Sequence, residues 1–241
     1  MKKQYLLIIS IIFISSLSYA QEFSVGARGG LNYYTIGDIN SRGGSFQSGA
    51  PDELFSPNKD LGTQFGAFLN VEFGKLYVRG EINFVSNKNN YDFPNKVSNW
   101  KASKTNIPIL VGYKVFDPIS IYAGIGFDVL GKVSLDGVQE TSYSDGGPDL
   151  EKTSTNVTVG IMVEFKRFGL DLRYEPGSKE TVEELLDIDH SAYGVNLADL
   201  RSYKPSQLSL SLNIYIFRTN SSDIGGLFTN LFRSDKCHCP Y

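Results

Sequence analysis

Two long strings of alternating residues, joined at Gly74-Lys75, occupy the stretch from Leu61 to Lys88. The apolar positions are Phe65, Ala67, Leu69, Val71 and Phe73 in the first string and Leu76, Val78, Ile82 and Phe84 in the second. Successive side chains of a β-strand point to opposite faces, so each string predicts a strand with one apolar face. Each runs for about 12 residues, against ~5–6 in soluble sheets, and a strand needs ~9–11 residues to cross a bilayer. The pair is typical of a transmembrane β-hairpin.

The first 20 residues are typical of a secretory signal peptide. Lys2-Lys3 is a basic start, Leu6 to Ile14 is an apolar run, and Ser18-Tyr19-Ala20 ends it with small residues where a signal peptidase reads. We expect cleavage after Ala20, which changes the formal charge from −3 to −5 because Lys2 and Lys3 are lost. A mildly acidic chain without a basic patch argues against nucleic acid as a partner.

The same alternation recurs along the mature chain and predicts eight strands. Besides the hairpin, the strings are Glu22–Tyr33, Thr105–Phe116, Ile119–Lys132, Thr155–Lys166, Phe168–Glu175 and Ser206–Phe217. Long polar connections, at 37–60, 87–104, 133–153 and 176–204, alternate with short turns, and residues 181–188 have room for a turn or two of helix. This pattern predicts an all-β fold: an eight-stranded antiparallel up-and-down transmembrane β-barrel over residues 21–217, with short periplasmic turns and long extracellular loops.

A soluble eight-stranded barrel of the lipocalin kind is the structural alternative. Such a barrel buries its apolar faces inward, and its strands are rarely all so long. The 13% aromatic content and 24 glycines suit a barrel in lipid better.

In lipid, the polar face of each strand lines the barrel interior. The charged residues expected there are Arg28, Glu72, Arg79, Glu81, Lys114, Asp128, Glu164, Asp171, Arg173 and Glu175. An eight-stranded barrel is just wide enough for side chains to fill it, and charges kept from water must be paired. A balanced set therefore favours a salt-bridge network that fills the barrel over a selective conduit.

Several motifs resemble the outer-membrane β-barrel family common in Bacteroidota, often labelled porin family or PorT-like. They are VGARGGLN at Val25–Asn32, FGAF at Phe65–Phe68, NIPILVGYK at Asn106–Lys114, YAGIG at Tyr122–Gly126 and LDLRY at Leu170–Tyr174. The resemblance covers the whole mature barrel and implies the fold and a cell outer membrane address in a Gram-negative bacterium. It implies no enzymatic activity, and PorT itself belongs to a secretion and gliding apparatus.

The last strand departs from this pattern. Such barrels usually end on an aromatic residue that the barrel-assembly machinery reads, and Tyr215 and Phe217 hold those places, yet the alternation puts Ile214 and Ile216 outward. A bulge, a late change of register or an alternation misjudged by one residue would explain this.

The chain continues through residues 218–241, which we expect to be a periplasmic tail. Its apolar residues Ile224, Leu227, Phe228, Leu231 and Phe232 have helical spacing. So short a helix needs a surface to bind. The inner leaflet, the barrel mouth or a periplasmic protein partner would each provide one, and a disordered tail is the alternative.

Other candidate chemistry is weak. Cys237-His238-Cys239 resembles half of a zinc site, but zinc takes about four ligands, so we expect no metal and no cofactor. His190 adjoins Ser191, but adjacent side chains of an extended segment diverge and cannot form a nucleophile–base pair. The acidic runs at 145–151 and 183–189 lack the spacing of a calcium loop and read as solvated surface.

Three functions stay open. The first is a non-enzymatic barrel in outer-membrane lipid that is structural or part of a membrane or secretion assembly. The second is a narrow passive channel for small solutes. The third is an outer-membrane enzyme that modifies lipid A.

Overall fold

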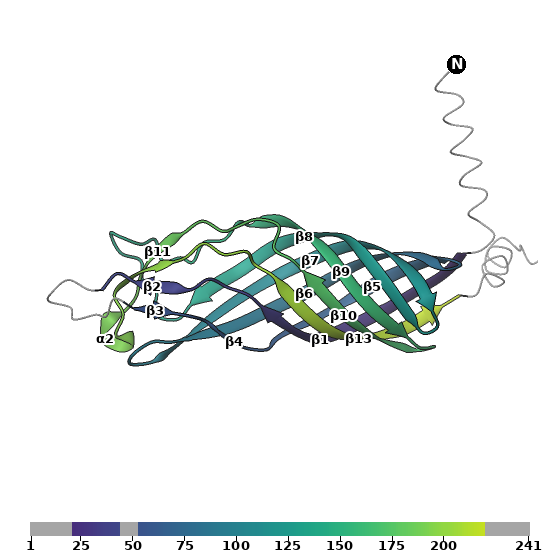
Figure 1. Cartoon of the computed structure of the whole chain (residues 1–241), viewed down its shortest axis with the longest axis horizontal. Coiled ribbons are helices and arrows are strands. Elements are labelled where there is room, and N and C mark those ends of the chain that lie inside the picture. The colour runs from purple at the N-terminus through teal and green to yellow at the C-terminus, as the bar shows by residue number, and fades with distance from the viewer. Residues whose placement is uncertain (1–20, 44–52, 220–241) are drawn as a thin grey trace, which may run out of the picture.

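The computed structural model describes residues 21–43 and 53–219 (Figure 1). The strands are β1 Gln21–Tyr34, β2 Ile39–Ser41, β3 Leu54–Phe55, β4 Asn58–Lys59, β5 Gly62–Phe73, β6 Leu76–Asp92, β7 Val97–Phe116, β8 Ile119–Leu135, β9 Thr153–Glu164, β10 Phe168–Glu175, β11 Glu184–Asp187, β12 Leu197–Leu200 and β13 Gln207–Arg218, and the helix α2 is His190–Tyr193. None of the described helical residues forms a helix long and apolar enough to span a membrane. The expected signal peptide, the apolar tail positions and Cys237-His238-Cys239 lie outside the described residues.

Eight long strands close into an antiparallel ring. The order β6-β5-β1-β13-β10-β9-β8-β7 returns to β6 through the β6–β7 pairing, and β1 pairs with β13 from Tyr34↔Gln207 to Ser24↔Arg218. The tilted strands wind around one long axis (Figure 1). Because a closed ring leaves no long edge unpaired, its backbone groups are satisfied without water. The prediction of an antiparallel all-β barrel is confirmed.

The ring is apolar outside and polar inside. Outward residues such as Phe65 and Ile125 are 65% and 56% exposed, whereas the inward residues alternating with them, such as Gln64, Phe68 and Tyr122, are buried. A water-soluble barrel would have the opposite arrangement. Exposed apolar side chains all around a ring suit a lipid surround and exclude the lipocalin-like alternative.

The two ends of the ring differ. At one end, which we refer to as the turn end, strands are joined by short connections at Gly74-Lys75, Asp117-Pro118 and residues 165–167. Gly74 has φ +64°, a left-handed conformation that glycine adopts without a steric cost.

The other end carries a small folded unit, which we refer to as the cap. A second antiparallel sheet, in the order β11-β12-β2-β3, packs with α2 over the extended ends of β6, β7 and β8 (Figure 1). Its core consists of Tyr34, Ile36, Ile39, Phe55, Tyr91, Phe93, Trp100, Ala102, Leu135, Leu186, Ile188, Tyr193, Val195, Ala198, Leu200 and Tyr203. We refer to the ring end beneath it as the cap end.

Two expectations about the connections were wrong. The predicted loop 87–104 is mostly strand, because β6 runs to Asp92 and β7 begins at Val97, with Trp100 and Tyr91 buried beneath the cap. The segment 181–188, which had room for a turn or two of helix, instead contains strand β11, which pairs with β12 and buries Leu186 against the cap core. Tertiary pairing outweighs local preference in both segments.

A β-bulge in β13 resolves the departure at its end. Val25 pairs with Phe217 and Gly26 with Tyr215, so Ile216 is the extra residue. Ile216 and Phe217 are both exposed, at 74% and 48%, while Tyr215 points inward and is buried. The bulge therefore returns an aromatic residue to the outer face where the last strand ends.

Candidate functional site

The centre of the ring holds a buried group of five charged residues, which we refer to as the central cluster: Arg28, Arg79, Glu81, Asp171 and Arg173. Arg173 places both terminal nitrogens on Glu81, at 2.8 and 2.9 Å, and also contacts Asp171 at 3.0 Å. Arg28 pairs with Glu81 and lies 3.0 Å from Asp171, and Arg79 Nε lies 2.7 Å from Glu81. Two carboxylates thus hold three guanidinium groups together.

Polar contacts extend this cluster to the whole ring wall. All eight ring strands contribute to the connected set, through Arg28, Gln64, Glu81, Asn106, Tyr122, Met162, Arg173 and Ser211. Asn83 links the β6 and β7 members by donating to Glu81 and Asn106, and Arg28 and Gln64 both donate to Ser211. The set crosses the barrel from wall to wall, and each of its charged members lies in an ion pair with another.

Ion pairs also occupy the turn end. Glu72 pairs with Lys114 and with Arg218, the latter at 2.8 Å, and accepts a hydrogen bond from Asn70 at 2.9 Å. Glu164 accepts a hydrogen bond from the buried Tyr215 hydroxyl.

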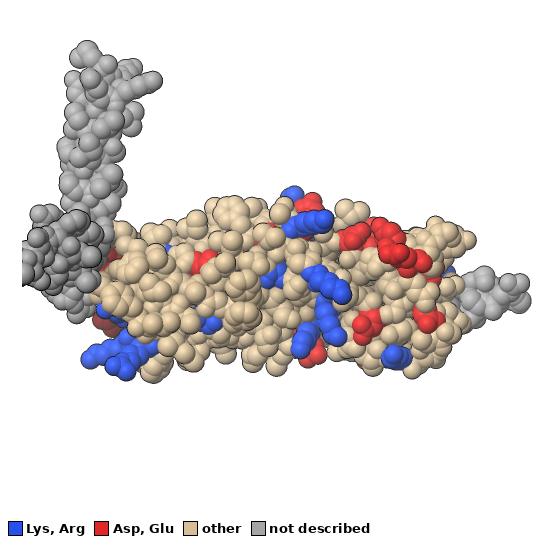
Figure 2. Space-filling model, turned by 180° about the vertical axis from the view of Figure 1, so that it is seen from behind, with Lys and Arg blue, Asp and Glu red and all other residues tan. Residues whose placement is uncertain are grey.

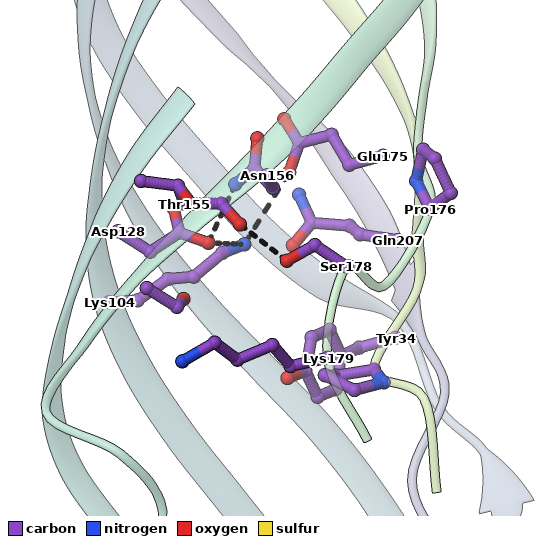
Figure 3. Close-up of a pocket in the computed structure, with 12 residues that line it drawn as sticks. Tyr34, Lys104, Asp128, Thr155, Asn156, Glu175, Pro176, Ser178, Lys179 and Gln207 are labelled. Carbon is purple, nitrogen blue, oxygen red and sulfur yellow. Dashed lines mark hydrogen bonds and ion pairs between the residues drawn. The ribbon is translucent and has the colours of Figure 1, made fainter. Parts of the chain in front are cut away.

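At the cap end, Lys104 lies between Asp128 and Glu175, at 3.1 and 3.4 Å (Figure 3). Asn156 and Asn106 also donate to Asp128, at 2.7 and 2.6 Å. A cavity of about 70 Å³ adjoins these groups and is lined on its other side by Tyr34, Ser178 and Gln207. It has room for a few water molecules.

The polar interior at the cap end of the ring is incompletely paired by protein. Within the described part of the chain, side-chain oxygens of Asn32, Asn87, Asn89, Gln207 and Ser209 are buried without a hydrogen-bond partner. Buried polar groups are normally satisfied, so these oxygens mark positions for internal water. Ordered water there would extend the polar filling without opening a path.

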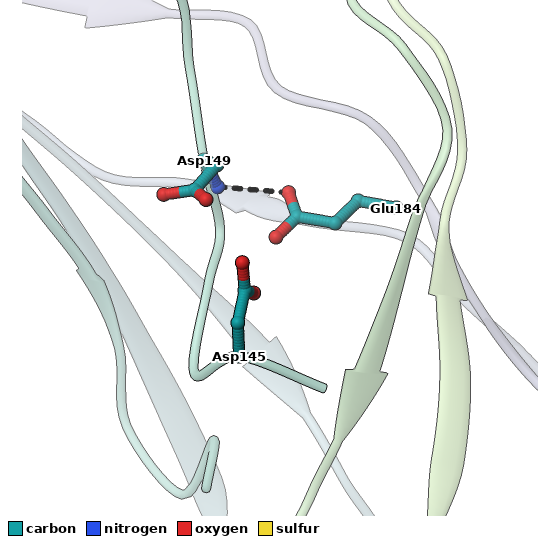
Figure 4. A group of neighbouring side chains, drawn as sticks. All are labelled: Asp145, Asp149 and Glu184. Atoms are coloured by element: carbon teal, nitrogen blue, oxygen red, sulfur yellow. Dashed lines mark hydrogen bonds between the residues drawn. The ribbon is translucent and has the colours of Figure 1, made fainter. Parts of the chain in front are cut away.

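Three carboxylates meet in the cap. Asp145 and Asp149 lie beside Glu184, whose Oε2 accepts a hydrogen bond from the Asp149 backbone N–H at 2.8 Å (Figure 4). Burial raises the pKa of Glu184, and the negative charges of Asp149 and Asp145 raise it further. Calcium takes about 6–8 oxygen ligands, so three carboxylates, two of them exposed, do not by themselves make a calcium site.

His190 and Ser191 do not form a catalytic pair. His190 is the first residue of α2, and Asp189 caps that helix by accepting hydrogen bonds from the backbone N–H groups of Ser191 and Ala192. The Ser191 hydroxyl donates to Asp189 at 2.6 Å, which lowers the pKa of that carboxyl. The Ser191 hydroxyl is thus bonded to a carboxylate, and the segment starts a short helix.

The structure places all ten predicted interior charges on the inner side of the ring or at its mouths. It also adds cationic partners that the sequence reading missed. Lys104 fell in an expected loop, and Arg218 lay one residue past the expected last strand, so neither entered the inward set. Tyr122 is a further polar partner outside the predicted charged set, because its hydroxyl donates to Asp171 and accepts a hydrogen bond from Arg173 Nε at 3.0 Å.

Comparison with known proteins agrees with this architecture. Residues 6–215 match a family model described as an outer membrane protein beta-barrel domain. Similar solved structures include OprG from Pseudomonas aeruginosa, at 15% identity and TM-score 0.48, over 84% of this chain and 97% of OprG. Ail of Yersinia pestis has 14% identity and TM-score 0.42 over 83% and 99%, and Neisserial surface protein A has 14% and 0.40 over 80% and 97%. A search of curated proteins found no match.

Proposed function

Since the chain belongs to the outer membrane protein β-barrel family and resides in the outer membrane of a Gram-negative bacterium, we propose that it is a closed, non-enzymatic barrel that anchors a folded cap outside the cell. The turn end then faces the periplasm and the cap faces the exterior, because short turns are periplasmic in such barrels and long connections are extracellular.

The single observation that carries this proposal is the ion-paired filling of the ring. The central cluster and the polar side chains bonded to it include residues from every ring strand, and the cap core covers the cap end. A solute would have to break several buried ion pairs to pass, each of which is costly to separate inside a low-dielectric interior. The interior charges are therefore better explained as a structural filling than as a selectivity filter.

Within this role, the PorT-like motifs support membership of a membrane or secretion assembly. We propose two surfaces for protein partners: the cap outside and the expected periplasmic tail of residues 218–241, where Ile224, Leu227, Phe228, Leu231 and Phe232 would form the docking face. Cross-linking in cells followed by mass spectrometry tests this part, with a chain lacking residues 222–241 as the comparison. Loss of one specific periplasmic cross-link on truncation supports the assembly role, and an unchanged set removes it for the tail.

Planar-bilayer conductance tests the closed barrel. The purified chain is expected to give no reproducible opening, and a variant with Arg28, Glu81 and Arg173 all replaced by alanine, if folded, is expected to admit ions. Stable openings by the unmodified chain would favour the passive channel. The enzyme alternative predicts a lipid A mass spectrum that changes with the intact protein but not with His190→Ala.

A further inference from the structure

A row of exposed lysines encircles part of the ring where its apolar outer face ends. Lys88 on β6, Lys101 on β7 and Lys132 on β8 are exposed and lie on adjacent strands, and we refer to them as the lysine belt. Figure 2 shows basic side chains gathered in a band across this face, between the broad uncharged surface and the acidic patches of the cap end. Lys59 and Lys152 flank the belt, through the Lys59↔Asn89 pairing and the bond from Leu130 N–H to Lys152 O.

The belt brings like charges together. Lys88 and Lys101 are direct cross-strand partners, an arrangement that is destabilising unless an anion lies between them. Among the described residues, no carboxylate lies within ion-pair distance of any belt lysine. Nearby acids have other partners: Asp92 accepts from Asn58 at 2.8 Å, and Asp136 accepts from Asn99 at 2.9 Å.

The outward side chains beneath the belt change from apolar to hydroxyl to cationic along β6 and β7. On β6 the outward residues run Phe84, Ser86, Lys88, and on β7 they run Ile107, Thr105, Ser103, Lys101. Four strand residues span roughly 13 Å, so Lys88 lies about that far from Phe84 along the strand. Such a gradient matches the passage from acyl chains to phosphate headgroups at the membrane interface.

A groove opens on the lipid-facing side directly below the belt. Its volume is about 400 Å³, and Phe65, Phe84, Thr105, Val129 and Gly131 are among the residues that line it. A register shift between Ala102 and Lys104 forms its upper edge, where Ser103 Oγ accepts a hydrogen bond from the Lys132 backbone N–H at 3.0 Å. Gly131 has no side chain at this edge, where a Cβ atom would lie 2.6 Å from Ser103 Oγ.

We propose that the lysine belt binds the phosphate groups of lipid A, the phosphorylated glycolipid of the outer leaflet, with one acyl chain lying in the groove. Each ammonium donates to phosphate oxygens, which removes the repulsion between Lys88 and Lys101. The proposal rests on the outward orientation of the cap end given under the proposed function. It requires neither the closed interior nor a protein partner.

The test uses the full mature chain folded in detergent, with purified lipid A as the probe and native mass spectrometry as the readout. The variant K88Q/K101Q removes two belt charges, and the matched control K75Q/K166Q removes two exposed lysines at the turn end. The belt variant is expected to bind lipid A about 30-fold more weakly, from the usual contribution of a lysine near an anionic lipid surface, and the control is expected to bind as the unmodified chain does. Equal loss in both variants, or in neither, overturns the proposal.

Two further measurements sharpen the result. Dephosphorylated lipid A should bind the unmodified chain and K88Q/K101Q equally; a difference between the chains with this probe would contradict phosphate recognition. In lipid-free detergent the belt variant should unfold no earlier than the unmodified chain, because it loses a repulsion. Added lipid A should raise the unfolding temperature of the unmodified chain and of K75Q/K166Q more than that of K88Q/K101Q. Labelling of Val182→Cys on intact cells reports the orientation separately, since Val182 is 87% exposed on the cap side of the ring.

Discussion

Tyr77 on β6 lies across Gly112 on β7, and its ring occupies the space that a Cβ atom on Gly112 would take. The same relationship joins Tyr122 on β8 to Gly160 on β9. In each pair, a glycine on one strand makes room for an inward tyrosine ring from the neighbouring strand. The ring fills the interior and helps to fix the register of the two strands. The second pair also sets the Tyr122 hydroxyl against Asp171.

Gly112→Ala should destabilise the barrel, because the new methyl group would overlap the buried Tyr77 ring. The expected loss is ~1–3 kcal/mol in the free energy of unfolding, as for other overpacked interiors. Urea unfolding in detergent or lipid vesicles measures it. Gly80→Ala is the matched control, since a Cβ at Gly80 meets no atom within 4 Å. Equal stability of the two variants would contradict the Tyr77–Gly112 packing.

Glu81→Ala should lower the free energy of unfolding by more than a substitution on the surface does. Removing Glu81 leaves Arg28, Arg79 and Arg173 buried with only Asp171 to balance them, and breaking a buried ion pair costs ~3–5 kcal/mol. Glu151→Ala is the control, because its pair with Lys179 is exposed and such pairs contribute ~0–1 kcal/mol. Urea unfolding of both variants measures the two free energies. Equal losses in Glu81→Ala and Glu151→Ala would contradict a structural role for the central cluster.

Trp100→Ala should loosen the cap without opening the ring. Trp100 is buried and stacks on Tyr34 with ring centroids 5.5 Å apart, and truncating such a residue costs ~3–5 kcal/mol. Limited proteolysis should then cleave the cap segments while the heat-dependent gel shift of the folded barrel persists. The unmodified chain offers a parallel readout, because Trp100 is its single tryptophan and its emission should move to longer wavelength when the cap opens. Simultaneous loss of cap and ring would show that they unfold as one unit.

Glu184 should make cap stability depend on pH. Because burial raises the pKa of Glu184, the folded cap holds that proton more tightly than the unfolded chain. The resulting stabilisation is complete below the unfolded pKa of about 4.3 and disappears as pH rises through the folded pKa. Glu184→Gln should therefore leave the cap unchanged at low pH and more stable at neutral pH. Hydrogen exchange of β11 and β12, followed from low to neutral pH, measures the stability of the cap. The same pH dependence in the unmodified chain and in Glu184→Gln would contradict this role of Glu184.

The alternation of apolar residues was sufficient to locate the ring strands, because lipid imposes one apolar face on every strand that crosses it. It failed where strands leave the membrane. At Asn87–Asp92 and Val97–Lys104 the outward residues meet water and most of them are polar, so the outer face lacks the apolar alternation of a membrane-spanning strand. Lys104 was missed as a partner of Asp128 and Glu175 for this reason.

The cap could not be predicted from periodicity. Its strands contain two to four residues each and come from distant segments, so their pairing depends on contacts that no short window contains. Leu185-Leu186 fits a short helix as well as a strand, and only the pairing with Ala198 and Asp199 decides between them. The inward positions of the charged residues could be inferred from the alternation of faces along each strand. Which charges pair with each other depends on which strands lie opposite one another across the ring.

The pairing of β1 with β13 also determines the order in which the molecule can be made. The two strands that seal the ring lie at opposite ends of the barrel sequence, so closure must wait until β13 has been synthesised and exported. Until then the nascent sheet keeps two free edges, which are open to pairing with other chains. Contacts this distant in sequence also form slowly. A chain cut before β13 would therefore yield an open, aggregation-prone sheet rather than a smaller barrel.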